Sequence, residues 1–291
     1  MLTAHNLRTL FLIVLLTGIL MAIGGLLGGL SGLVTALVIA FAMNFFVYWF
    51  SDSLALKMAH AKPVSEQEQP RLHQMVERLA QRARIPKPKV YLIANDSPNA
   101  FATGRSPSHA AVACTSGILG LMSEKELEGV LAHELAHVKN RDTLTMTVVA
   151  TVAGAITFIA NMLTWGMMFG GFGGRNGEGR GSAAGVGLVI ALLVAVLAPI
   201  AAMLVQLAIS RSREFQADAS GARINGDPYP LADALEKLDS AVHRRPMEVN
   251  QATAHLFIVN PLSGRSMARL FSTPPPVEER VRRLRGMRMS L

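Results

Sequence analysis

The sequence predicts a mainly α-helical integral membrane protein with four transmembrane helices and an α+β portion outside the membrane that contains a small β-hairpin or sheet. Of its 291 residues, 51% are hydrophobic and 16% are charged, whereas an average soluble domain has about 25% charged residues. Three runs, 9–51, 143–174 and 181–210, contain no charged residue. Each is longer than the roughly 20 apolar residues that cross a bilayer.

Residues 1–51 are predicted to form a transmembrane hairpin of two helices. The uncharged run is too long for a cleaved signal peptide, and the glycine-rich segment 24–32 divides it into the pieces 10–27 and 33–50. The spacing of small residues in that segment fits either a turn or close helix pairing, and a turn is the simpler interpretation. The second piece ends in aromatic residues, as is typical of a membrane interface.

Residues 52–142 have the composition of a water-exposed domain. Apolar spacing predicts a helix at 67–83, which two prolines separate from a strand at 89–93. Two further β-prone runs, 99–104 and 110–115, flank a turn and predict a hairpin. The one cysteine of the chain, Cys114, excludes an intrachain disulfide, and its apolar neighbours favour buried packing over a nucleophilic role.

A helix that follows this hairpin carries the most specific motif of the chain. Ser123 and Glu126 form a capping box, and the helix behind them places His133 and His137 one turn apart on one face. Two neutral imidazoles at this spacing can bind one Zn²⁺, and Glu134 can then reach a water on the metal. The pattern predicts a zinc metalloprotease site with one zinc per chain, although a helix with two surface histidines has the same spacing.

A third zinc ligand is expected far along the chain, because the motif alone supplies two. Glu214 and Asp218 lie four residues apart on one helical face directly after the last uncharged run. Glu214 completes a ligand set of two histidines and one glutamate, and Asp218 can accept a hydrogen bond from a ligand histidine. Taken without the histidine motif, Glu214 and Asp218 could equally be a solvated acidic pair beside Arg211 and Arg213. The presence of the histidine motif makes zinc ligation the stronger interpretation.

The rest of the chain is assigned by composition. Residues 143–210 are predicted to hold the second transmembrane pair, 144–165 and 186–209, joined by the glycine-rich loop 170–185. This loop lacks the lysine of a phosphate-binding loop and is interpreted as a flexible linker. Residues 211–291 are expected to carry the third ligand and a basic helical tail whose arginines face lipid or solvent.

The net charge of +8 indicates a lipid surface and not nucleic acid, since the basic residues flank the apolar runs and no aromatic-studded basic motif is present. By the positive-inside rule, the termini and the zinc site are expected in the cytoplasm. The residues that give this orientation are Arg8, Lys57, Lys62, Arg211 and Arg213.

Three segments together carry a resemblance to a known family. They are Asn99-Ala-Phe-Ala-Thr-Gly104, the histidine motif continuing to Asp142, and Ser210-Arg-Ser-Arg-Glu-Phe-Gln-Ala-Asp218. Interleaved with two pairs of spans, they resemble the HtpX family of bacterial inner-membrane zinc proteases, which are gluzincins related to the prenyl-protein endopeptidases of eukaryotic membranes. The likeness covers nearly the whole chain. One departure is Pro274, where family members often have a histidine.

The resemblance implies a zincin-like metalloprotease domain in the cytoplasm, with ligands His133, His137 and Glu214 and the catalytic base Glu134. It also implies a multi-pass inner-membrane endopeptidase that cleaves damaged or misfolded proteins, chiefly membrane proteins, in quality control and stress response. Substrate binding is expected at Asn99, Ala100 and Phe101, by pairing of a peptide with an edge strand; from spacing alone, a packing hairpin is about as good an account.

Other functions fit the sequence less well. Charged residues surround the motif, so cleavage inside the bilayer would bury many charges in lipid. A non-catalytic zinc-containing scaffold or chaperone would normally supply a fourth protein ligand, and none is evident. A transporter would need ionisable residues within its spans, and the four predicted spans have none. Either Arg211 or Arg213 could stabilise the oxyanion of the reaction, and the sequence does not choose between them. The sequence also does not indicate the oligomeric state.

Overall fold

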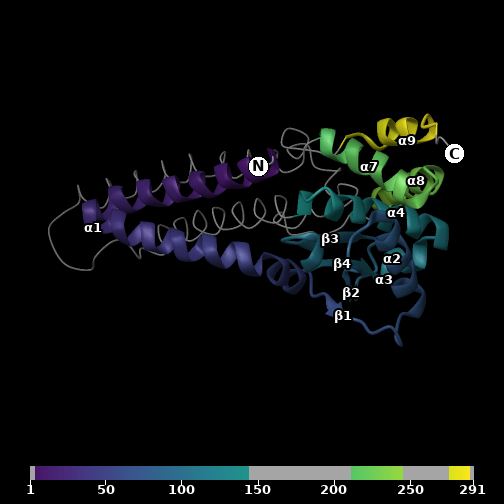
Figure 1. Ribbon diagram of the computed structural model, residues 1–291, viewed down its shortest axis with the longest axis horizontal. Helices are drawn as coiled ribbons and strands as arrows, with labels where there is room; N and C mark the ends of the chain where they lie inside the picture. Colours follow the sequence, from purple (N-terminus) through teal and green to yellow (C-terminus); the bar gives the residue numbers. More distant parts are fainter. Residues whose placement is uncertain (1–3, 144–210, 245–274, 289–291) are drawn as a thin grey trace.

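A computed structural model describes residues 4–143, 211–244 and 275–288 (Figure 1). The predicted second transmembrane pair, its glycine-rich loop and Pro274 lie outside these residues. The described elements are α1 (Ala4–Met58), β1 (Lys62–Pro63), α2 (Pro70–Ala83), β2 (Lys89–Ile93), β3 (Ala100–Gly104), the 3₁₀ turn η1 (Pro107–His109), β4 (Ala110–Thr115), α3 (Ser116–Leu121), α4 (Glu124–Lys139), α7 (Arg211–Asn225), α8 (Tyr229–Arg244) and α9 (Val277–Arg285).

Four short strands form one mixed sheet in the order β1-β2-β4-β3. The predicted hairpin is confirmed, because β3 and β4 pair antiparallel, with Ala102 opposite Val112. The predicted strand at 89–93 is also confirmed, and it runs parallel to β4. Since β3 pairs only with β4 in the described sheet, its other side faces the helices and not a further strand. On that side the Ala102 N–H of β3 donates to Glu134 of α4, so this edge of the sheet adjoins α4.

Both faces of the sheet are covered by helices. One face joins a large apolar core that contains residues of α2, α4, α7 and α8, among them Leu79, Leu131 and Leu235. On the other face, Leu56 near the end of α1 packs against Phe101 and Ala113. Small residues dominate β3 and β4, and this lets the helices approach the sheet closely.

The α1 element doubles back on itself, and in Figure 1 its two halves meet at the turn and diverge from it. The reversal falls at Gly29, whose φ of +58° suits glycine far better than other residues. The halves also meet closely, since a Cβ on Gly24 would lie 2.5 Å from both the Gly32 carbonyl oxygen and Ala36 Cβ. The glycine-rich segment therefore supplies both the turn and the close contact.

No helix among the residues that the structure describes combines the length and the apolar character that crossing a membrane requires. The four predicted spans stay a prediction.

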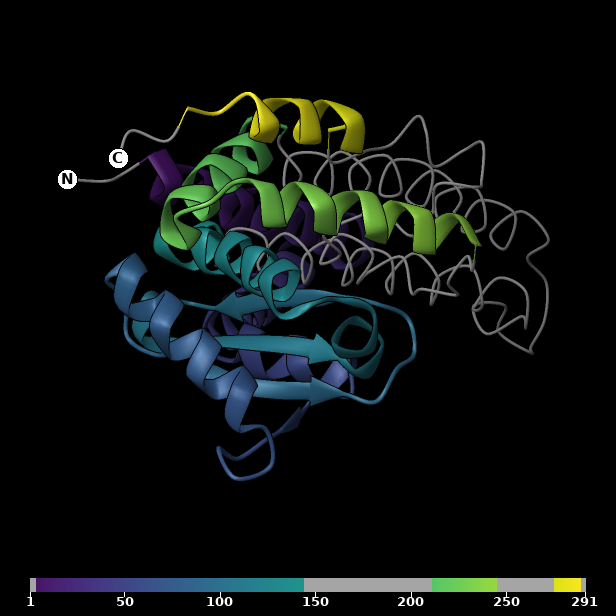
Figure 2. The same ribbon diagram turned by 90° about the vertical axis from the view of Figure 1, so that its right-hand side faces the viewer.

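The helices α4, α7, α8 and α9 stack above the sheet (Figure 2). Two glycines allow this stack to be tight. A Cβ on Gly129 would lie 2.7 Å from the Leu231 nitrogen of α8, and a Cβ on Gly221 of α7 would lie 2.9 Å from both His133 N and His133 Cα in α4. Because the obstructing atoms are backbone, no side-chain rotation can relieve the collision. Gly221 therefore sets the separation of α4 and α7.

Gly221→Ala should push α7 away from α4 and lower the free energy of unfolding by about 1–3 kcal/mol, the usual cost of overpacking. The matched control is Gly120→Ala in α3, because Gly120 is exposed and has open space around it. That change should leave stability unchanged or raise it by about 0.5–1 kcal/mol. Thermal unfolding of the detergent-purified protein measures both, and equal effects of the two substitutions would contradict the packing account.

Candidate metal centre

Helix α4 begins and is oriented as the sequence predicts. Ser123 Oγ accepts the Glu126 N–H, and Glu126 Oε2 accepts the Ser123 N–H at 2.7 Å, so the capping box is confirmed. The helix is buried along much of its length, between the sheet on one side and α7 and α8 on the other. His133, Glu134 and His137 are all buried as a result.

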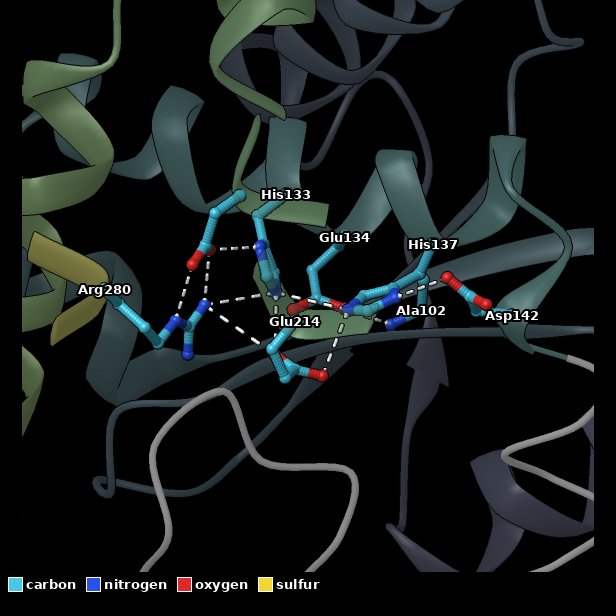
Figure 3. A network of polar contacts seen from close by, with 8 residues as sticks. Ala102, His133, Glu134, His137, Asp142, Glu214 and Arg280 are labelled. Carbon is cyan, nitrogen blue, oxygen red and sulfur yellow. Dashed lines mark hydrogen bonds and ion pairs between the residues drawn. The ribbon is translucent and has the colours of Figure 1, made fainter. Parts of the chain in front are cut away.

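The three predicted zinc ligands converge in space (Figure 3). His133 Nε2 lies 3.2 Å from His137 Nε2 and 3.5 Å from Glu214 Oε2, and His137 Nε2 lies 3.7 Å from Glu214 Oε1. Donor atoms around a tetrahedral zinc, each about 2.0–2.1 Å from it, are roughly 3.3–3.4 Å apart. The two imidazole planes are nearly perpendicular, at 89°. The spacing and the donor types therefore fit one zinc ion.

A carboxylate faces the outer nitrogen of each histidine. Asp218 Oδ1 lies 2.9 Å from His133 Nδ1, and Asp142 Oδ2 lies 3.3 Å from His137 Nδ1. A proton held at Nδ1 in this way leaves the Nε2 lone pair directed at a metal. Asp218 was expected in this role, whereas Asp142 was missed. It follows α4 by three residues, and Arg141, with a φ of +60°, turns the chain back toward His137.

Arg280 of α9 was also missed, and its position corrects an expectation. The arginines of the C-terminal tail were expected to face lipid or solvent, and Arg282, Arg283 and Arg285 are exposed, but Arg280 is fully buried at the metal centre. Its Nε and Nη2 donate to the two oxygens of Asp218 at 2.9 and 2.6 Å. The apolar spacing of α9 held a signal, since Arg280 shares one helical face with the buried residues Val281 and Leu284.

Glu134 points from α4 toward the edge strand. Its Oε2 accepts the main-chain N–H of Ala102 in β3 at 3.0 Å. Burial is the largest influence on the carboxyl and raises its pKa, outweighing the opposing effects of His133 and His137. A carboxyl with a raised pKa, fixed beside a metal site, suits a group that accepts and returns a proton.

The predicted substrate residues divide into two kinds. In an antiparallel pair, alternate residues direct their main-chain groups away from the partner strand. The N–H of Ala102 bonds Glu134, and the carbonyl of Gly104 accepts a hydrogen bond from Thr143 Oγ1 at 2.9 Å, so Ala100 has the same outward orientation. Asn99 and Phe101 instead hold the strand in place.

The main chain of Asn99 makes two hydrogen bonds to Thr115: its N–H donates to the Thr115 hydroxyl, and its carbonyl accepts the Thr115 N–H, each at 2.9 Å. The Phe101 side chain packs on the face of the sheet that α1 covers. Of the two arginines considered as oxyanion donors, Arg211 is exposed and Arg213 is buried.

The charges of the site depend on one another. Burial acts to lower the pKa of His133, but the Asp218 and Glu214 carboxylates outweigh it and raise the pKa to about 9. Burial acts to raise the pKa of Glu214, but the two histidines and Arg280 outweigh it and lower the pKa to about 2. Without a metal the site therefore holds a proton on His133 at neutral pH beside an ionised Glu214. Burial likewise raises the thiol pKa of Cys114 to about 12, in keeping with its expected packing role.

Zinc binding should release this proton, because a metal takes the neutral imidazole. The zinc affinity of the metal-free protein should rise with pH up to about 9, by up to roughly tenfold per pH unit, and then level off. Isothermal titration in two buffers of different ionisation enthalpy counts the protons released. No proton release at pH 7, together with the same affinity at pH 7 and 8.5, would contradict the assigned charge state.

The chain is similar to known proteins. Residues 66–288 match the model of Peptidase family M48. The chain is 53% identical over 283 residues to a protein named Protease HtpX homolog from Pelotomaculum thermopropionicum, covering 97% of the chain and 99% of the relative. A Pyrococcus furiosus protein of the same name is 51% identical over 285 residues, covering 98% and 96%. The crystal structure of S. mikatae Ste24p aligns with a TM-score of 0.49 at 19% identity, over 85% of this chain and 57% of that one.

Proposed function

The chain belongs to peptidase family M48 and, within it, to the HtpX proteases; from this premise we propose that it is a membrane-bound zinc endopeptidase. The observation that carries the proposal is the convergence of His133, His137 and Glu214, with Glu134 held beside them by the edge strand. A metal and a proton acceptor at one point are what peptide hydrolysis requires.

Bound zinc would supply Lewis-acid chemistry, polarising the scissile carbonyl and lowering the pKa of the attacking water. The protein's own part begins with Glu134, which takes a proton from that water and returns it to the leaving amine. The Ala102 N–H fixes the carboxylate for this task. Asp218 and Asp142 hold the two imidazoles so that their Nε2 atoms point into the site.

The substrate in this proposal is an extended peptide that pairs with the outer side of β3. The outward main-chain groups of Ala100 suit such pairing, which aligns a peptide by backbone hydrogen bonds without strong demands on its side chains. All residues of β3 are buried, so this edge must be uncovered before a peptide can pair with it. Low sequence selectivity suits an enzyme that removes damaged or misfolded proteins.

The membrane part of the proposal rests on the apolar runs of the sequence and on the contact between α1 and the sheet. Directly after β3, Arg105 stacks over the Trp49 ring, 4.5 Å from its centroid, and donates to the Trp49 carbonyl oxygen at 3.3 Å. The edge strand is thereby tied to the predicted transmembrane hairpin. We infer an inner-membrane location with a cytoplasmic site and membrane proteins as the chief substrates, in quality control and stress response.

The second candidate is a non-catalytic scaffold that keeps zinc as a structural clip. A structural zinc normally has four protein ligands, and the described residues bring three histidine or carboxylate ligands together. Glu134 also argues against the scaffold. This buried carboxylate is not one of the three ligands, and its own hydrogen bond to Ala102 orients it beside them. A purely structural zinc site would not need such a group.

Glu134→Gln should retain about one zinc per chain and lower the rate of casein cleavage by roughly 10²- to 10⁴-fold, because the amide cannot accept a proton from water. Glu124→Gln is the matched control on the same helix, since Glu124 is exposed and pairs with Arg71 at the surface. Metal analysis and cleavage assays on detergent-purified protein measure both properties. Cleavage by the Glu134 variant would refute its role, zinc without cleavage in the wild type would favour the scaffold, and absence of zinc would refute the site.

A further inference from the structure

Helix α9 reaches the metal centre from a distant part of the chain. Arg280 is 62 residues from its partner Asp218 and 147 from His133. The helix is held across α7 and α8 by several contacts. Val281 and Leu284 are buried in the main core, Arg283 stacks on Phe215 at 3.6 Å, and Arg285 pairs with Asp233 and Glu236 at 3.1 and 2.9 Å.

Arg280 fixes the orientation of the Asp218 carboxylate. Its Nε donates to Oδ2 and its Nη2 to Oδ1, in the two-pronged geometry that only arginine provides. The same Oδ1 lies 2.9 Å from His133 Nδ1. The carboxylate therefore cannot rotate to leave His133 without breaking a hydrogen bond to Arg280. A chain of contacts runs from α9 through α7 to the ligand on α4.

The guanidinium also compensates buried negative charge. Besides Asp142, three carboxylates, Glu134, Glu214 and Asp218, lie within the site at 4–6% exposure, and Arg280 is fully buried beside them. Its Nη2 lies 3.8 Å from Glu214 Oε2. A buried carboxylate that has lost its cation is strongly disfavoured in place and tends to turn away from its buried position. Loss of Arg280 would thus deprive His133 of a fixed acceptor.

We propose that Arg280 is a positioning residue for the metal centre: docking of α9 sets Asp218, and Asp218 sets His133, so zinc affinity depends on α9. This inference rests on the proposed function in taking zinc as the metal of the site, but it does not require that the protein cleave peptides. It assigns to the C-terminal basic helix a role in assembling the metal centre.

The test compares zinc affinities in the full-length, detergent-purified protein. Arg280→Gln and Asp218→Asn should each weaken zinc binding by roughly 10- to 100-fold, the usual effect of removing the group that orients a ligand. Arg280→Lys should lose less zinc affinity, because lysine keeps the positive charge. Some loss should remain, because lysine cannot form the two-pronged contact. Arg282→Gln is the matched control, as Arg282 is an exposed arginine two positions along the same helix. Competition with a chromophoric chelator measures the dissociation constants.

The double variant Arg280→Gln/Asp218→Asn separates positioning from a general structural role. If Arg280 acts through Asp218, the double variant binds zinc as weakly as a single variant, and the two losses do not multiply. The double variant also leaves no carboxylate at position 218 without its cation, so it should fold more readily than Arg280→Gln alone. Circular dichroism and thermal unfolding verify that each protein is folded.

Wild-type affinity in a folded Arg280→Gln protein, losses that multiply in the double variant, or an equal loss in Arg282→Gln would each overturn the proposal. These results leave the protease assignment untouched, because they concern metal affinity alone. Conversely, a wild-type protein that binds zinc but cleaves nothing would refute the proposed function and leave the role of Arg280 standing. A wild-type protein without zinc affinity would overturn both.

Discussion

The structure depends above all on matching buried charges at the metal centre. His133, Glu134, Glu214, Asp218 and Arg280 are nearly excluded from water, and each is stable there only because an opposite charge or a hydrogen-bond donor lies within reach. The groups come from α4, α7 and α9. Their mutual pairing therefore demands that three helices from distant parts of the sequence meet at one place.

Close packing makes that meeting possible. Gly221 lets the backbone of α7 approach α4 beside His133, and Gly129 does the same for α8, so the carboxylates of α7 reach the imidazoles of α4. The sheet completes the arrangement from the other side, because the Ala102 N–H holds Glu134. The edge strand is in turn tied to α1 through Arg105 and Trp49. A single set of contacts thus joins the predicted membrane hairpin to the metal centre.

The two residues that the sequence did not reveal share a physical reason. Asp142 and Arg280 reach the site through contacts that the local sequence does not specify: one depends on a left-handed turn at Arg141, the other on how α9 docks. A charged residue on an amphipathic helix is usually solvated, and the buried face of α9 distinguishes Arg280 only once the partners Asp218 and Glu214 are placed.

The sequence by itself determined the local features: the capping box at Ser123, the placement of His133 and His137 on one helical face, and the hairpin of β3 and β4. These follow from helical and strand periodicity, which act over a few residues. Only the tertiary structure decided which carboxylate serves each histidine, that β2 runs parallel to β4, and that Arg280 is buried. Such features arise from packing between distant segments, and no short-range pattern encodes them.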